Sequence, residues 1–591
     1  MRRVPLLLGS LLPALAGTLL AQVPAAGGGN PPARMARIGF VSGSVSFQPS
    51  GDTAWSAATL NYPMTTGDRV YADRGARAEL QIGSVVVRAA DQADLTVTDL
   101  TDQFLQLGLT QGTIRVSVYQ LAPGDSVEVD TPHGALTLLD VGDYRIDAPP
   151  GDSAITVTVG KGSLQWTAGG VAQVVQSGQA IRISGINPIQ VASVPPHAPD
   201  GFDQWSAERD SRLKASASAQ YVSRDIPGYD DLDGAGAWQV DPSYGPVWYP
   251  AGVPAGWVPY RYGHWVWIEP WGWTWVEHER WGYAPFHYGR WLYGRGAWGW
   301  LPGPAAVRPC YAPALVVFVD GSSAGAQAWF PLGPGEPYYP WYHHDGEYQR
   351  KVNVTNIRNA TNIAQITDVT YINRIQYRNR GPGMTAVPTT GFQGRGPIAG
   401  RVLGEPAQRF ATAPIAPHAF VLPGASAAAG GIPEPRPSTG RRPTWVTAPP
   451  PRPAQAAGPG RPLVVRRELP AAQAAPVLIT RQQPPPQNVP FPQRQKAMQP
   501  DNGRPLEPQQ IDNLRAGKPA GARRDPEYPP HPAAGPAAPP PRQPVGPAGG
   551  QAAPVPRQPA NPAAGQAAPA PRRPAGPAPR PATPPARKRQ P

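Results

Sequence analysis

Tryptophan is concentrated in one segment of this 591-residue chain, and that segment limits the folds open to it. Residues 244–300 hold eleven of the 18 tryptophans, and 19 of these 57 residues are aromatic, against 8% of the whole chain. The pattern G-[WY]-x-P-x-x-Y-G-x-W begins at Gly256 and again at Gly282, and a truncated copy begins at Gly299. The alternating tryptophans that follow each copy predict small aromatic β-hairpins joined by glycine and proline.

Rings at this density form either a binding platform or the core of a small domain. Burying them barely offsets the conformational entropy lost when the segment is ordered, so few rings can be left exposed. We therefore expect most of them to form a core. Trp271, Trp281 and Trp298 stand beside turn glycines. They are our candidates for exposed aromatics that contact a ligand.

The N-terminus has the layout of a secretory signal peptide. Arg2 and Arg3 precede an apolar run over residues 4–20, which Pro13 interrupts and small residues follow. We expect a signal peptide over residues 1–26 and a protein that works in the periplasm or at the cell surface; an uncleaved membrane anchor is the alternative. No later stretch reaches the length of a membrane span, so no span is expected after cleavage.

Residues 35–190 show apolar alternation with period two, interrupted about every ten residues by Gly, Pro or Asp. Clear examples are 114–118, 155–159 and 181–183. Alternation of this kind is typical of strands with one buried face, and no helical period competes with it. The expected fold class is mainly β, with a sandwich, barrel or β-roll in this region.

Four stretches of this region resemble the FecR-type periplasmic domain in order and spacing: Leu-Thr-Gln-Gly-Thr-Ile-Arg-Val at 109–116, Val-Glu-Val-Asp-Thr-Pro-His-Gly at 127–134, Val-Thr-Val-Gly-Lys-Gly-Ser-Leu at 157–164 and Ser-Gly-Gln at 177–179. The resemblance implies a FecR-like β sandwich or β-roll. In that family the domain often relays an envelope signal through a membrane helix to an anti-sigma segment. We find neither in the sequence and expect the fold alone to carry over.

Residues 195–240 are expected to form a linker and one short amphipathic helix. Asp200 can cap a helix that runs to Tyr221, and Phe202, Trp205 and Leu213 fall near one face of it. Packing is the expected role of Trp205.

Residues 241–395 form the predicted Trp/Tyr-rich β-repeat domain, whose units are similar to WXXGXW-type repeats. Together with the segments 202–205, 221–223, 228–232 and 383–388, they resemble an uncharacterised family of exported, proline-rich bacterial proteins that carry FecR-like domains. The resemblance covers residues 35–395. It implies a domain of unknown function with no assigned reaction.

Residues 400–591 are expected to be a long, disordered, basic tail rich in Pro and Ala. From residue 431 to the end there are 44 prolines and 23 Lys and Arg against 7 Asp and Glu. So few large apolar residues cannot offset the ordering entropy. The partners we expect are anionic envelope polymers, such as peptidoglycan or lipopolysaccharide, or envelope proteins; a solvated linker is the alternative. Nucleic acid is not expected as a partner.

Catalytic and metal-binding patterns are scarce. Glu277 and Glu279 are expected to share one face of a strand while His278 points away, which suits a solvated edge. Adjacent histidines at 343–344 have no third ligand at useful spacing, and residues 230–234 fit a solvated acidic turn better than a calcium loop. Cys310 is the only cysteine and cannot form an intramolecular disulfide. We expect no catalytic residue, metal or cofactor.

Together these patterns predict a non-enzymatic exported cell-envelope protein with a binding or scaffolding role, in which the basic tail contacts envelope polymers or partner proteins. Two alternatives stand beside it. One is a FecR-derived signal-relay component that acts through a partner protein. The other is carbohydrate binding by the aromatic repeat.

Overall fold

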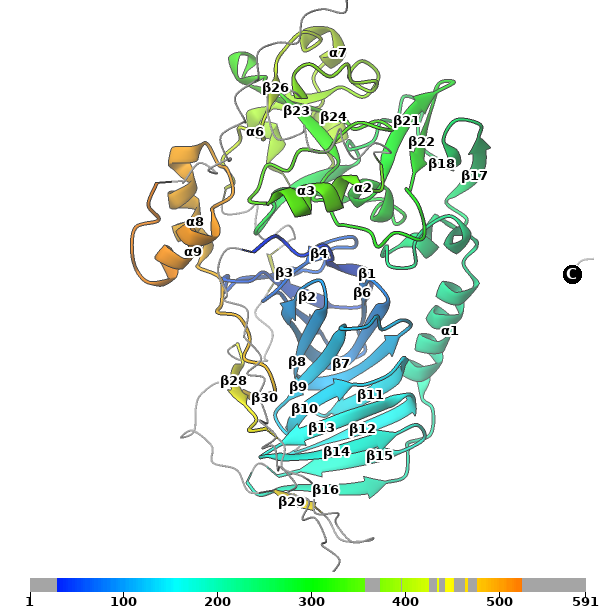
Figure 1. Ribbon diagram of the computed structural model, residues 1–591, viewed down its shortest axis with the longest axis vertical. Coiled ribbons are helices and arrows are strands. Elements are labelled where there is room, and N and C mark those ends of the chain that lie inside the picture. The colour runs from blue at the N-terminus through cyan, green and yellow to red at the C-terminus, as the bar shows by residue number, and fades with distance from the viewer. Residues whose placement is uncertain are drawn as a thin grey trace, which may run out of the picture. The chain divides into compact units, whose positions relative to one another are not determined.

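The computed structural model describes residues 29–522 apart from 152, 186, 357–371, 395, 425–432, 435–441, 451–462 and 466–475 (Figure 1). The predicted signal peptide at 1–26 and the chain beyond 522 lie outside the described residues. The described chain is mainly β with a few short helices, as the sequence predicted. No helix in the described ranges is both long and apolar enough to cross a membrane.

The first domain, here called the β domain, is built from β1 to β16. Its strands are β1 (Ala36–Ser42), β2 (Val45–Gln48), β3 (Trp55–Ala57), β4 (Pro63–Met64), β5 (Arg69–Ala72), β6 (Arg77–Ile82), β7 (Val85–Leu100), β8 (Phe104–Val118), β9 (Ser126–Thr131), β10 (Gly134–Leu138), β11 (Gly142–Ala148), β12 (Ala154–Lys161), β13 (Ser163–Ala168), β14 (Val171–Gln176), β15 (Ala180–Ser184) and β16 (Ile189–Val194). The alternating stretches at 114–118, 155–159 and 181–183 lie in β8, β12 and β15.

The long β7–β8 hairpin is shared by two ladders of strands. The second half of β8 pairs with β11, and that ladder continues through β12 and β15 to β16. The first half of β8 pairs in parallel with β9, and the other ladder continues through β10 and β13 to β14. The register of the β7–β8 hairpin shifts beside Gly112, whose φ is +89° and where a Cβ would lie 2.1 Å from the Cα of Ala93.

Helix α1 (Gly201–Ala215) follows the β domain and lies against it (Figure 1). The Asp200 side chain accepts hydrogen bonds from the backbone N–H groups of Phe202 and Asp203, at 2.8 and 2.9 Å. The predicted helix and its cap are therefore confirmed, but the α-helix ends at Ala215 and the short 3-10 turns η1 (Ala217–Gln220) and η2 (Tyr229–Leu232) follow. Half-buried Trp205 packs 5.3 Å from the ring of Phe40.

The second domain, here called the aromatic domain, runs from β17 to β26 and is made of short hairpins. Its elements are β17 (Gly236–Asp241), β18 (Gly245–Pro250), β19 (Gly263–Ile268), β20 (Gly272–Glu277), α2 (Ala284–His287), β21 (Arg290–Gly294), β22 (Ala297–Leu301), β23 (Val316–Val319), η3 (Ser322–Ala324), β24 (Ala326–Pro331), α3 (Gly346–Asn353), β25 (Thr385–Pro388), α6 (Thr389–Phe392), η4 (Ile398–Arg401), α7 (Pro406–Arg409) and β26 (Ile415–Ala416). The predicted hairpin across residues 269–272 is β19–β20, in which Trp265 faces Trp275 and Trp267 faces Trp273.

Part of the segment that we predicted to be a disordered tail is instead ordered. Its elements are β27 (Pro433–Glu434), β28 (Thr444–Thr447), β29 (Leu463–Val465), β30 (Val477–Thr480), α8 (Phe491–Met498), η5 (Gln499–Asp501) and α9 (Pro508–Arg515). Ile479 of β30 pairs with Thr131 of β9, and Arg494 of α8 forms an ion pair with Glu269 at 3.1 Å. Leu478, Ile479, Phe491, Met498 and Leu506 are buried. These few apolar residues are diluted in the average composition, which is why composition alone placed the boundary at residue 400.

Candidate binding surfaces

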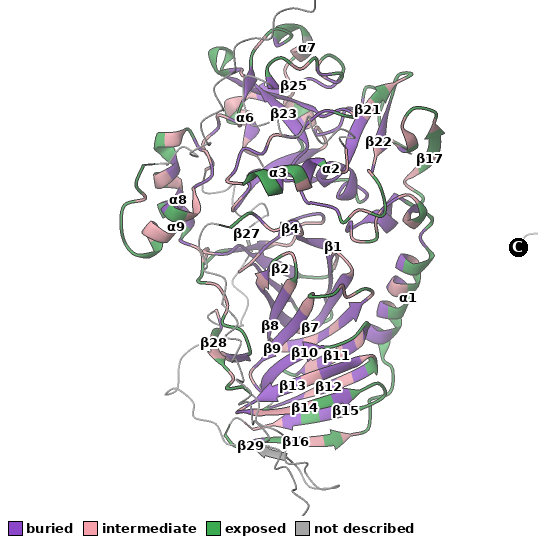
Figure 2. Ribbon diagram, in the orientation of Figure 1, coloured by how far each residue is buried: buried purple, intermediate pink, exposed green. Residues whose placement is uncertain are grey.

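All eleven tryptophans of residues 244–300 are buried. They are Trp248, Trp257, Trp265, Trp267, Trp271, Trp273, Trp275, Trp281, Trp291, Trp298 and Trp300. Strands β19 and β20, which hold four of them, are buried along their whole length, and purple strands of this domain are visible in Figure 2. The ring of Trp265, for example, packs 5.3 to 5.6 Å from the rings of Trp275, Phe318, Phe392 and Trp329. The expectation that these rings form a core is confirmed.

The expectation that Trp271, Trp281 and Trp298 are exposed is wrong. Trp271 is 0% exposed and the other two are 5% exposed. The ring of Trp271 packs 5.6 Å from Tyr311, and that of Trp281 packs 5.0 Å from Trp248. Turn glycines do not expose these rings, because other segments cover the turns.

The turn at Gly272 illustrates this covering. Its φ is +76°, and a Cβ at this position would lie 2.6 Å from the Cγ of Pro505 and 3.1 Å from the ring of Trp267. The Nε1–H of Trp273 donates to the carbonyl oxygen of Val421 at 2.9 Å. Both covering residues lie in the segment beyond residue 400, so the local sequence around the turn gives no sign of them.

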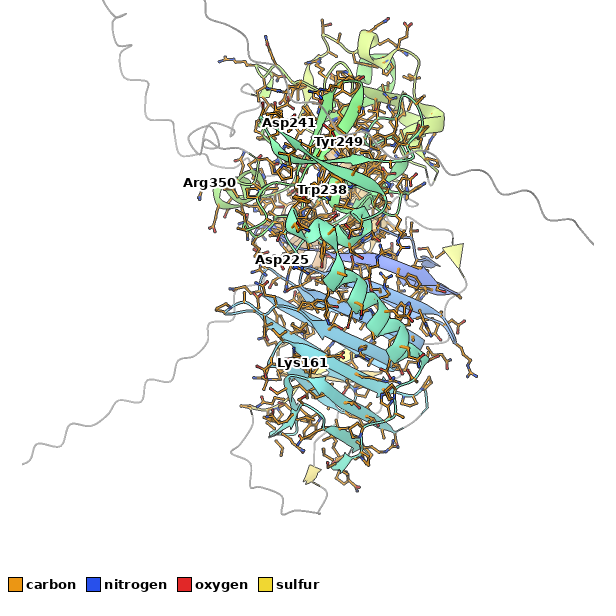
Figure 3. The ribbon with its side chains drawn as sticks, turned by 90° about the vertical axis from the view of Figure 1, so that its right-hand side faces the viewer. Lys161, Asp225, Trp238, Asp241, Tyr249 and Arg350 are labelled. Carbon is orange, nitrogen blue, oxygen red and sulfur yellow. The ribbon has the colours of Figure 1, made fainter. Side chains whose placement is uncertain are left out.

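A groove of about 470 Å³ opens on the aromatic domain. It is lined by Tyr249, Pro250, Val253, Pro254, Ala255, Gly256, Trp257, Val258, Arg261, Tyr293, Gly296, Ala297, Trp298 and Pro382. Tyr293 is 43% exposed and packs 5.0 Å from Trp298, which is the one predicted contact residue that reaches the groove. Figure 3 shows Tyr249 on the same hairpin as Trp238 and Asp241.

Arg261 is the one charged side chain in this lining. Its Nε–H donates to Thr385 Oγ1 at 2.9 Å and its Nη2–H to the Met384 carbonyl oxygen at 2.7 Å. Burial lowers the pKa of the guanidinium. The groove is therefore a surface of rings and prolines with one immobilised cation and no carboxylate.

Glu277, His278 and Glu279 do not form the arrangement that we expected. Strand β20 ends at Glu277, so the alternation stops there: Glu277 is buried while His278 and Glu279 are exposed. The Glu277 carboxyl group accepts from Trp275 Nε1–H at 3.1 Å and from the His278 backbone N–H at 3.0 Å, and burial raises its pKa to about 8. His278 Nε2 lies 2.9 Å from Nδ1 of His264. These contacts are structural.

The histidines at 343–344 each make a polar contact within the protein. His343 Nδ1 lies 2.5 Å from Glu507 Oε2, and His344 Nδ1 lies 2.8 Å from the Tyr342 carbonyl oxygen. Asp345 accepts from the Tyr348 backbone N–H at 2.8 Å and thereby caps α3.

One trio of ligand-type side chains, His197, Asp200 and Asp203, comes together in the described ranges. Asp203 already binds Arg115 and Arg145 at 2.7 and 2.8 Å, and Asp200 caps α1. These bonds use the oxygens that a cation would need.

The acidic turn at Asp230 and Asp231 is buried, which corrects the expectation of a solvated turn. Asp231 lies 2.7 Å from Arg37 of the β domain, 2.6 Å from Arg212 and 3.0 Å from Arg280. Burial raises the pKa of Asp230 to about 6, with a further contribution from the neighbouring carboxylate of Asp231. The turn therefore joins the two domains through ion pairs.

Arg37 is the centre of this joint and is fully buried. Its Nη2–H donates to Asn61 Oδ1 at 2.7 Å and to the Arg280 carbonyl oxygen at 2.9 Å, while Asn61 Nδ2–H donates to the Glu277 carbonyl oxygen at 3.0 Å. Sequence reasoning missed the joint because its members lie up to 243 positions apart. The one local signal was an arginine within the apolar alternation of β1.

Comparison with known proteins adds little to this geometry. Residues 229–336 match a family of unknown function, DUF6600, which begins at the acidic turn and includes the aromatic hairpins. No curated protein matches the chain.

Among solved structures, two crystal structures of a candidate anti-sigma factor from Parabacteroides distasonis ATCC 8503, at 2.50 and 1.65 Å resolution, are similar to part of the chain. Each has 15% identity and a TM-score of 0.20, and the match covers 22% of this chain. It spans 60% of the length of that protein. A similarity of this size supports no argument about function.

Proposed function

We propose that this chain is a non-enzymatic binding or scaffolding protein of the cell envelope, exported to the periplasm or the cell surface. The observation that supports a binding role is the groove on the aromatic domain. Whereas the eleven tryptophans of residues 244–300 are buried, Tyr249 and Tyr293 in the groove lining are partly exposed, and the ring of Tyr293 packs 5.0 Å from Trp298. The export assignment rests on the signal-peptide pattern at residues 1–26.

The chemistry of the groove favours a proline-rich peptide over a sugar. Sugar-binding sites hold hydroxyl groups with several side-chain carboxylates, amides or free cations, and among these the groove lining offers only Arg261, which is bound to Thr385 and Met384. Aromatic rings with tyrosine hydroxyls form the surfaces that receive polyproline II segments. Carbohydrate binding, our third hypothesis, becomes the other outcome of the same test.

Fluorescence titration of the full chain tests this proposal. A ten-residue polyproline peptide should change tyrosine and tryptophan emission saturably, and a glycine-serine peptide of equal length should not. Tyr293→Ala should weaken the interaction, and Val240→Ala, an exposed apolar residue outside the groove, should leave it unchanged. Saturable binding of glycans without binding of the peptide would replace the peptide assignment by the carbohydrate one, and binding of neither would remove the groove as a site.

A second candidate site is the basic end of the chain, proposed to hold the protein near peptidoglycan or lipopolysaccharide. Residues 523–591 carry ten Lys and Arg against two Asp and Glu. The ordered elements β30, α8 and α9 end before this stretch, so a deletion from residue 523 leaves them in place.

Sedimentation with purified peptidoglycan and with lipopolysaccharide tests the second candidate. Binding should weaken with added salt and disappear when residues 523–591 are deleted. Binding that survives the deletion would contradict the proposal. The signal-relay alternative stays a prediction from the FecR resemblance, and an unchanged transcriptome in a deletion strain would count against it.

A further inference from the structure

A second hollow, of about 210 Å³, lies beside the joint of the two domains and is separate from the aromatic groove. It is lined by Gln81, Gly83, Ser84, Val86, Tyr119, Gln120, Leu213, Lys214, Arg224, Ile226, Pro227, Gly228 and Tyr229. These residues come from the β6–β7 turn, the end of β8, the last turn of α1 and the segment before η2. Its volume is below the roughly 300 to 1,000 Å³ of drug-sized pockets, which points to a small ligand.

The floor of this cavity is apolar. Val86, Leu213 and Ile226 are buried there, and the rings of Tyr119 and Tyr229 add further carbon surface. A ligand therefore needs an apolar body to gain from displacing water.

The inner polar groups of the lining already have partners. Gln81 Oε1 accepts from Arg37 Nη1–H at 3.0 Å, and its Nε2–H donates to Glu79 at 3.0 Å. The Tyr119 hydroxyl donates to Asp210 at 2.5 Å. The Tyr119 hydroxyl has therefore given its only hydrogen, and the Gln81 amide, which keeps one further N–H, is held between Arg37 and Glu79.

Two cations at the rim keep donors to spare. Lys214 Nζ lies 5.9 Å from the centre of the Tyr119 ring, and Arg224 Cζ lies 5.9 Å from that of Tyr229. Arg224 Nη1–H also makes a long contact of 3.4 Å with the Tyr229 hydroxyl. Neither cation forms an ion pair with a carboxylate in the described part of the chain. Each is held at the cavity by a ring, with most of its N–H groups unused.

We propose that this cavity binds a small amphipathic anion. Its apolar body lies on Val86, Leu213 and Ile226, and its acidic group accepts charge-assisted hydrogen bonds from Lys214 and Arg224. A medium-chain carboxylate has this chemistry. A neutral or cationic molecule with the same body lacks the acceptor that the two cations require.

The site is also placed to act on the joint between the domains. Gly228 is part of the lining, and a Cβ there would lie 2.3 Å from Arg37 Nη1. Gln81, which also lines the cavity, accepts from the same guanidinium nitrogen at 3.0 Å. An anion that binds this lining only when the joint is formed stabilises the joint, and the formed joint binds the anion more tightly in return.

Isothermal titration calorimetry of the full chain with octanoate tests the proposal. One molecule should bind per chain and raise the unfolding temperature, and 1-octanol and octylamine should bind at least roughly tenfold more weakly because they lack the anion. Failure of octanoate to bind saturably, or equal binding of the three probes, would overturn the proposal.

Variants then locate the site. The double variant Lys214→Met, Arg224→Met keeps both side-chain stems and should lose octanoate affinity roughly tenfold or more. Lys161→Met is the matched control, since Lys161 is an exposed cation on β12 that lies away from Asp225, the neighbour of Arg224, in Figure 3. Retained affinity in the double variant, or an equal loss in the control, would contradict the assignment. Unchanged far-ultraviolet circular dichroism establishes that the variants are folded.

Discussion

The β domain and the aromatic domain are both built mainly from antiparallel hairpins, but different contacts hold each domain together. The β domain has strands of up to 16 residues, paired in continuous ladders around aliphatic side chains. The aromatic domain has strands of four to six residues in its larger hairpins, and ring-to-ring contacts connect one hairpin to the next. Short hairpins are marginal alone, so in the second domain the rings replace the ladders as the source of cohesion.

The comparison predicts that single ring deletions have the largest effects. Trp265→Ala removes a ring that contacts four others and should lower the free energy of unfolding by about 3 to 5 kcal/mol. Urea unfolding followed by circular dichroism measures this. A loss below 1 kcal/mol would show that the rings do not act as one core.

The buried carboxyl group of Glu277 makes the aromatic domain sensitive to pH. Its pKa is raised from 4.5 to about 8 by burial, so the folded state binds more protons than the unfolded state, and the free energy of unfolding falls as pH rises through this window. Glu277→Gln replaces the titratable carboxyl group by a neutral amide. The free energy of unfolding of this variant minus that of the unsubstituted chain should therefore rise by on the order of 3 kcal/mol between pH 5 and pH 8. A pH-independent difference would exclude a neutral Glu277.

In the β domain, removal of one methyl group tests the aliphatic core. Ile146 is fully buried on β11 between β8 and β12. Ile146→Val should lower the free energy of unfolding by about 1 kcal/mol, measured by the same urea titration. A loss as large as that of Trp265→Ala would contradict the proposed difference between the aliphatic core and the aromatic core.

The smallest effect is expected at the groove. Tyr293 is 43% exposed, so Tyr293→Ala should change the free energy of unfolding by less than about 0.5 kcal/mol while it weakens peptide binding. A large loss of stability would mean that Tyr293 belongs to the core, and the groove would then need a different probe variant.

The sequence predicted the elements better than the sites. Period-two alternation located several strands of the β domain, among them β8, β12 and β15, Asp200 marked the start of α1, and the breaker at residues 269–272 located the β19–β20 hairpin. These signals are local, because capping, turn geometry and alternation act over a few residues. The prediction that Trp271, Trp281 and Trp298 are exposed was wrong because exposure depends on what packs over a turn. Pro505, which covers the turn at Gly272, lies far from it along the chain.

By itself, the sequence determined that the chain is mainly β, that residues 244–300 form an aromatic core, and that the last residues are basic and rich in proline. Only the tertiary structure decided that all eleven tryptophans are buried, that Arg37 and Asp231 join the domains, and that residues 476–522 are ordered. The physical reason is the range of the interactions. Propensity and periodicity act between neighbours, whereas buried ion pairs and covered turns form between residues hundreds of positions apart.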